Sequence, residues 1–182
     1  MSGPFGLSMG MKLEDLRMQA EQELVKLSNI DCDQYEIVPI SKHSSFDSYN
    51  VNISEKYGLY RIVAIGKIIN TSVHGHEVKN EFKNLVDGFS KGYGKCNLSD
   101  FLSYGSIWNE PQDWMNGLLH RERFLAADWS VEHQSNMKND LTSINIFTFA
   151  LDQSSAQLIV NYYFSNSKDA ESEKKDLEDS IL

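Results

Sequence analysis

Cysteine, proline and long apolar runs are all scarce in this chain. Its 182 residues include two cysteines, Cys32 and Cys96, which lie far apart and form no C-x-x-C motif. A structural zinc site needs about four clustered cysteine or histidine ligands, so the sequence predicts neither such a site nor a disulfide framework. Free thiols of this kind are typical of a reducing compartment.

No stretch approaches the roughly 18 consecutive apolar residues that mark a transmembrane helix. Residues 1–11 contain no basic segment followed by a long apolar one, which is the pattern of a secretory signal. We therefore expect a cytoplasmic protein that does not bind membranes.

Positive charge is also in short supply. Lysine and arginine total 17 against 26 aspartates and glutamates, which gives a formal net charge of −9 at pH 7. Such a surface repels the phosphate backbone, so we expect no nucleic-acid binding. It would attract a basic protein partner at long range, although many proteins are acidic without having such a role.

Catalytic signatures are missing as well. The patterns G-x-S-x-G, Walker A and G-x-G-x-x-G do not occur in the chain. Neither cysteine has a nearby histidine that would mark it as a nucleophile. The sequence predicts no cofactor and favours a binding protein over an enzyme.

What the sequence does contain is regular apolar periodicity. Apolar residues at spacings of three and four predict one helix over residues 12–28 and a second over 76–91. The triplet Gly92-Tyr93-Gly94 ends the second helix, because glycine is the usual left-handed residue at a helix C-terminus. Pro111 suits the first turn of a short helix over 111–119.

Six further segments have the composition and alternation of strands. They are residues 35–40, 49–54, 59–69, 122–131, 143–151 and 157–164. Because helices and strands do not strictly alternate, we expect an α+β fold. Its sheet should be mainly antiparallel, with about five to six strands and two main helices packed on it. Residues 1–167 would form a single domain, and residues 168–182 an acidic, mobile C-terminal tail.

The apolar positions of these segments define the expected core. Trp129 belongs to it, because it lies on the apolar face of an alternating strand. The full set is Leu16, Leu24, Ile62, Val63, Ile65, Phe82, Leu85, Phe89, Trp129, Ile146, Phe147 and Val160.

The most distinctive segment is 104–115, which holds two of the three tryptophans and two carboxylates in twelve residues. The two tryptophans either fill the core or lie on the surface, where tryptophan is enriched at binding hot spots. In the second case the binding residues are Trp108, Glu110, Asp113 and Trp114. Their acidic groups would meet lysine or arginine of a basic partner.

Two alternatives remain open. His74-Gly75-His76-Glu77 is the only close cluster of histidines with a carboxylate, and it would suit a small metal-dependent hydrolase or, more simply, a turn before a helix. The other alternative is self-association to a homo-oligomer through strand 157–164. That strand contains Tyr162-Tyr163-Phe164 and is taken here as an edge strand.

The opening Phe5-Gly6-Leu7-Ser8-Met9-Gly10-Met11, followed directly by a helix, resembles the start of small, mostly uncharacterised bacterial α+β domains. The later Gly58-Leu59-Tyr60-Arg61-Ile62 is similar to their central strand. This resemblance covers about the first 70 residues and implies a binding module like immunity and inhibitor proteins. Together with the missing catalytic motifs, it predicts a non-catalytic protein-binding module of immunity, inhibitor or chaperone type.

Overall fold

The structure is a computed structural model that describes residues 3–23, 27–29 and 33–179. The α-helices are α1 (Leu13–Glu23), α2 (His76–Tyr93), α3 (Trp114–Leu119) and α4 (Ser167–Asp179). Two 3-10 helices, η1 (Pro4–Gly6) and η2 (Pro111–Asp113), accompany them. None of the helices in the described part of the chain combines the length and the apolar composition needed to cross a bilayer.

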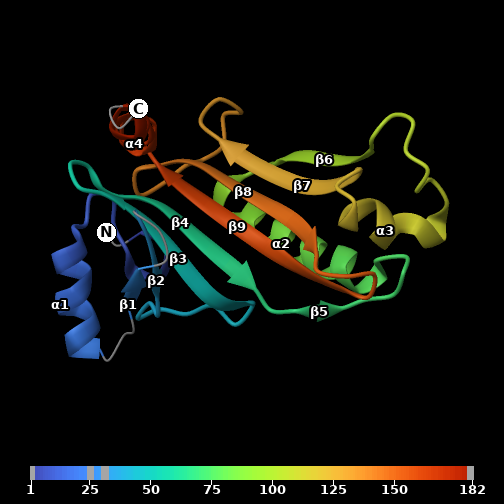
Figure 1. Ribbon diagram of the computed structural model, residues 1–182, viewed down its shortest axis with the longest axis horizontal. Coiled ribbons are helices and arrows are strands. Elements are labelled where there is room, and N and C mark those ends of the chain that lie inside the picture. The colour runs from blue at the N-terminus through green and yellow to red at the C-terminus, as the bar shows by residue number, and fades with distance from the viewer. Residues whose placement is uncertain (1–2, 24–26, 30–32, 180–182) are drawn as a thin grey trace. The chain divides into compact units, whose positions relative to one another are not determined.

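The strands form one sheet with the order β1-β2-β3-β4-β9-β8-β7-β6, and β5 pairs with β9 off this path (Figure 1). Their bounds are β1 Leu27–Asn29, β2 Gln34–Ile37, β3 Phe46–Ser54, β4 Gly58–Gly66, β5 Ile69–Asn70, β6 Asn97–Leu102, β7 Arg123–Ser130, β8 Leu141–Ala150 and β9 Ser155–Phe164.

The α+β class and the antiparallel sheet are confirmed. The element counts were too low: within the described ranges the sheet path has eight strands rather than five to six, and there are four α-helices rather than two. The β6 strand was missed because its sequence does not alternate cleanly. The segment 157–164 is not an edge strand, because β9 lies between β4 and β8.

The chain divides into two compact units. The first comprises Met1–Ala64, Met137–Ser143 and Asn161–Leu182, and the second Ile65–Asn136 and Ile144–Val160. The helices α1 and α4 belong to the first unit, and α2 and α3 to the second.

In the first unit, the opening segment, residues 5–11, packs into the core through Phe5. The ring of Phe5 packs edge-on against Phe46, Tyr49 and Tyr162, with ring centroids 5.9, 4.7 and 5.5 Å away. Such aromatic pairs contribute about 0.5–1.5 kcal/mol each beyond their buried area. Phe5, in the opening segment, therefore serves packing.

Backbone hydrogen bonds between residues 10–11 and Leu59 hold this opening segment in place. Gly10 donates its N–H to the oxygen of Leu59 at 2.9 Å, and Leu59 donates back to the oxygen of Met11 at 2.8 Å. A Cβ on Gly58 would collide with the backbone of Gly10. Gly58 also has a φ of +71°, a conformation that side chains other than glycine rarely adopt.

The C-terminal segment is helical and makes specific contacts. Ala170 of α4 is buried. Lys174 donates from Nζ to Oδ1 of Asp33 at 2.8 Å, and Ser54 donates to the carboxylate of Glu173. Burial by itself raises the pKa of Asp33, but hydrogen bonds from Lys174 and Tyr60 outweigh it and hold that pKa below its ordinary value. These contacts argue against a mobile tail that begins at Lys168.

In the second unit, α2 runs along one face of β7, β8 and β9 (Figure 1). The residues Val78 and Phe82 of α2 and Trp129 of β7 are buried. The indole nitrogen of Trp129 donates to the oxygen of Gly94 at 2.8 Å, so this tryptophan also holds the residue that follows α2. Its predicted place in the core is confirmed.

The predicted core is confirmed for seven residues: Leu16, Ile62, Val63, Phe82, Trp129, Ile146 and Val160. The residues Ile65, Leu85 and Phe89 are only half-buried. Phe147 is 46% exposed, because successive strand residues point to opposite faces and its neighbour Ile146 occupies the buried one. The predicted Leu24 and the free thiol of Cys32 lie outside the described residues.

Two phenylalanines of the second unit make a matched test of this core. We expect Phe82→Ala to lower the free energy of unfolding by about 3–5 kcal/mol, because its side chain is only 4% exposed. The same truncation at the exposed Phe147 should cost less than about 1 kcal/mol. Urea denaturation of both variants measures the difference, and equal losses would contradict the placement of the two rings.

We expect truncation after Ser167 to lower the melting temperature by about 4–8 °C at pH 7. It leaves Asp33 without its lysine partner, a loss of about 2 kcal/mol. Because the pKa of Asp33 is lowered in the folded chain, this contribution is present above the unfolded value near 3.9 and is lost as the pH falls through the folded value. The gap between full-length and truncated chains in calorimetry should therefore shrink below about pH 4. A gap that grows there would contradict the assignment.

Candidate functional site

The turn before α2 is built around Glu77. Its carboxylate accepts from the backbone N–H of Ser72 at 2.7 Å and from the hydroxyl of Thr71 at 2.9 Å. The backbone hydrogen bond from Ser72 is the main cause that lowers the pKa of Glu77 to about 2. The carboxylate thus stays charged at the helix N-terminus, where the helix dipole favours a negative charge. This confirms the simpler interpretation of the His74–Glu77 cluster as a turn.

Segment 104–115 packs directly on this turn. Met115 donates its N–H to the oxygen of Val73 at 3.1 Å, and Nδ1 of His74 lies 3.0 Å from the oxygen of Pro111. The ring of Trp114 lies so close to Gly75 that any Cβ there would overlap it. The two segments that the sequence singled out separately therefore form one site in the second unit.

Two cations flank Trp114. The Nζ of Lys79 lies 4.3 Å from a ring centroid of Trp114, and Cζ of Arg123 lies 5.9 Å away. Lys79 also donates to the oxygen of His74 at 2.8 Å. Burial and the nearby charge of Arg123 lower the pKa of Lys79. Cations over the face of tryptophan are stabilising, so this cluster holds the ring in place.

The four predicted binding residues have different environments. Trp114 is 6% exposed and belongs to the core. Trp108 is half-buried and stacks on His120, with centroids 4.9 Å apart and planes at 4°. Glu110 is exposed and Asp113 is half-buried. The side chains of Trp108, Glu110 and Asp113 are therefore accessible to a partner, whereas Trp114 is buried beneath the surface.

Large apolar side chains are exposed near these residues. They lie on the terminal strand β6, on β7 directly opposite it, and in the loop 103–110 that follows β6. We call this set the edge surface: Phe101, Tyr104, Ile107 and Phe124.

Its members are well exposed and partly ordered against one another. Tyr104 is fully exposed and Ile107 is 74% exposed. Phe101 and Phe124 face each other across β6 and β7 and stack, with centroids 4.8 Å apart. The sequence pattern did not predict this surface, because the residues of β6 do not alternate cleanly between apolar and polar.

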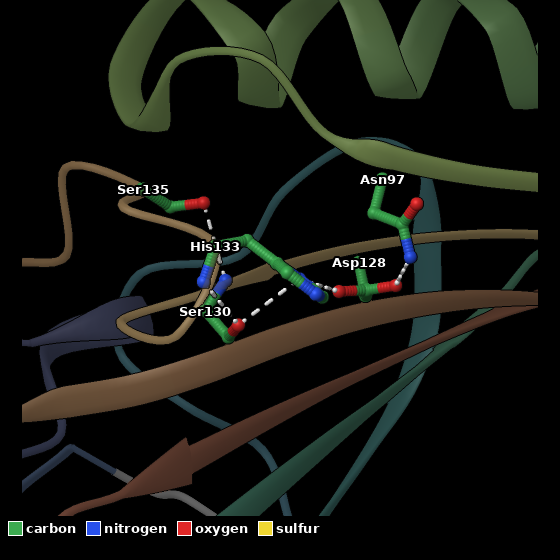
Figure 2. Close-up of polar contacts among 5 residues, drawn as sticks. All are labelled: Asn97, Asp128, Ser130, His133 and Ser135. Atoms are coloured by element: carbon green, nitrogen blue, oxygen red, sulfur yellow. Dashed lines mark hydrogen bonds and ion pairs between the residues drawn. The ribbon is translucent and has the colours of Figure 1, made fainter.

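A second polar cluster lies at the end of β7 and was also missed. Figure 2 shows His133 between Asp128 and Ser130, with Asn97 on the far side of the carboxylate. The Nδ1 of His133 lies 2.8 Å from Oδ2 of Asp128 and 3.2 Å from Oγ of Ser130, and Asn97 donates to Oδ1 at 3.0 Å. The only sequence signal was the spacing of the three residues in a strand and the turn after it.

This cluster does not have the geometry of a hydrolytic triad. In a triad, aspartate binds Nδ1 and serine lies at Nε2, so that one nitrogen can take the serine proton. Here both Asp128 and Ser130 lie at Nδ1 of His133. Ser130 also accepts from the backbone N–H of His133 and donates its own N–H to Ser135 Oγ, each at 3.2 Å. The contacts serve to order the turn.

The alternative of a small metal-dependent hydrolase would use the two histidines of the turn before α2. The rings of His74 and His76 have centroids 5.5 Å apart. Across the residues that the structure describes, no group of three or more histidine, cysteine, aspartate or glutamate side chains is placed to hold a metal ion.

Comparisons with protein-family models, curated proteins and solved structures found no match to this chain.

Two glycines of the same helical region test the contact that holds Trp114. We expect Gly75→Ala to lower the free energy of unfolding by at least about 2 kcal/mol, because a φ of +67° and the Trp114 ring both oppose a side chain. Gly88→Ala, inside α2 with open space around it, should raise stability by about 0.5–1 kcal/mol. Urea denaturation measures both changes. If Gly75→Ala leaves the free energy of unfolding unchanged, the placement of the Trp114 ring against Gly75 is wrong.

Proposed function

We propose that this chain is a non-catalytic cytoplasmic protein-binding module of immunity, inhibitor or chaperone type. The proposal places the partner on the edge surface and the adjoining loop residues Trp108, Glu110 and Asp113. Its main support is the gathering of large exposed apolar side chains on one terminal strand and the loop after it. Apolar patches of this kind commonly mark interaction sites.

The composition of the loop supports a protein partner. Tyr104 and Ile107 supply apolar contact area, and Glu110 is an exposed carboxylate close to them in sequence. The centres of protein interfaces are enriched in aromatic residues and their rims are polar. The stacked pair Phe101 and Phe124 extends the apolar surface onto the sheet.

Charge supports a basic partner. The chain has a net charge of −9, and residues 103–113 contain Glu110 and Asp113 without any lysine or arginine. Long-range attraction would raise the association rate, and burial of the apolar side chains would then set the dissociation rate. Trp114, held by Lys79 and Arg123, keeps the loop in position without touching the partner.

Site-specific photo-crosslinking in the native cells tests the proposal. We expect Tyr104→p-benzoylphenylalanine to give one discrete adduct with a second protein, because this side chain is fully exposed at the proposed interface. The matched control is the same replacement at Met18, which is exposed on α1 of the other unit. Adducts that are identical from both positions, or none from position 104, would contradict the proposal.

Binding of the purified partner then provides a quantitative check. The double variant Tyr104→Ser/Ile107→Ser should raise Kd by about 30-fold or more, the loss expected for hot-spot side chains. Glu110→Lys should mainly slow association and weaken its salt dependence. Met18→Ser should change neither quantity. If the double variant binds like the wild type, the interface lies elsewhere.

A further inference from the structure

The backbone of β6 has one side without a strand neighbour. In the strand order of the described residues, β6 comes last and pairs only with β7. The β6–β7 register runs from Asn97↔Asp128 to Leu102↔Arg123. Just beyond it, Ser103 donates its N–H to the oxygen of Glu122 at 2.6 Å.

This hydrogen bond fixes which backbone groups point outward. In an antiparallel pair, hydrogen-bonded residues alternate with residues whose N–H and C=O face away from the partner strand. Because the backbone N–H of Ser103 points to β7, the backbone N–H and C=O groups of Asn97, Ser99 and Phe101 point to β7 as well. The N–H and C=O groups of the remaining residues point to the open edge. These residues are Leu98, Asp100 and Leu102.

The side chains of β6 do not protect this edge. Leu98 and Phe101 are 58% and 52% exposed and lie on opposite faces of the strand. The strand contains no proline and no lysine, two residues by which natural sheets usually block their edges. Its one charged residue, Asp100, is exposed and lies 3.6 Å from Arg123, which leaves carboxylate lone pairs open to a second cation.

We propose that β6 receives an extended strand of the partner, in antiparallel orientation, with a lysine or arginine opposite Asp100. The other positions follow from the residues that they would face: apolar opposite Leu98 and Leu102, aromatic opposite Phe101, and small and polar opposite Ser99. Opposite charges and apolar pairs directly across two strands stabilise their pairing. This inference rests on the proposed function and specifies how the partner would bind.

A synthetic peptide tests the inference with the full-length chain. The probe is a blocked, dye-labelled peptide with the sequence threonine-valine-phenylalanine-lysine-threonine-valine-threonine, titrated by fluorescence anisotropy. We expect saturable binding with a Kd below about 1 mM. Exchange of its lysine for glutamate should weaken binding about threefold to tenfold, and Asp100→Lys should reverse this preference.

Backbone substitution separates strand pairing from side-chain contact. Leu98→Pro removes an N–H that points away from β7, and edge strands tolerate proline at such positions. It should weaken peptide binding at least about tenfold, because it removes a hydrogen bond and obstructs the edge. The control Leu98→Thr keeps the N–H and should bind more tightly than Leu98→Pro. Thermal melts verify that both variants fold.

Amide hydrogen exchange of the wild type supplies a readout that needs no variant. The peptide should protect the amides of Leu98, Asp100 and Leu102, whereas those of Ser99 and Phe101 are already protected by β7. No saturation, protection elsewhere, or protection of these amides by self-association without peptide would overturn the inference. If crosslinking from Tyr104 succeeds and the peptide does not bind, the inference of strand addition is wrong but the proposed function stands. If both fail, the proposed function is wrong as well.

Discussion

The candidate site depends on the contact between the Trp114 ring and the bare backbone of Gly75. Only a residue without a side chain leaves room for the ring, and only glycine easily adopts the φ of +67° that the turn requires. With the ring in place, Met115 reaches Val73 and Pro111 reaches His74. The far end of loop 103–110 is thereby fixed, and Ser103 fixes its start through Glu122. A loop held at both ends loses less conformational entropy when it binds.

Elements with strong periodicity could be predicted from the sequence, because one covered face is enough to impose the pattern. The α2 stripe around Phe82 and the alternation that buries Trp129 are of this kind. The β6 strand could not be predicted, since among the described residues it pairs only with β7 and its mostly exposed residues do not alternate between apolar and polar. Phe147 was misplaced because the neighbouring Ile146 takes the only face of β8 that α2 covers.

The composition of the candidate site could be predicted better than its geometry. The segment 104–115 and the turn at His74 were both noticed, but their contact joins residues about forty positions apart in the chain, and local patterns carry no such information. The environment of Trp114 is set by Lys79 and Arg123, which come from other elements. The cluster of Asp128, Ser130 and His133 shows the converse: its residue types resemble a triad, and only the shared Nδ1 excludes that role.

The charged side chains around this site form two groups: partly buried cations that stabilise the fold and exposed carboxylates that would attract a partner. The cations Lys79 and Arg123 lie against the Trp114 ring and are partly buried, so they act on the fold at short range. The exposed carboxylates, such as Glu110, lie in a chain of net charge −9 and act on approaching molecules at the longer range that salt allows. Asp100 links the two groups, because it lies near Arg123 and stands on the open strand. A basic side chain at this strand would therefore meet an exposed carboxylate 3.6 Å from Arg123, where solvent screening keeps the energy of each ion pair small.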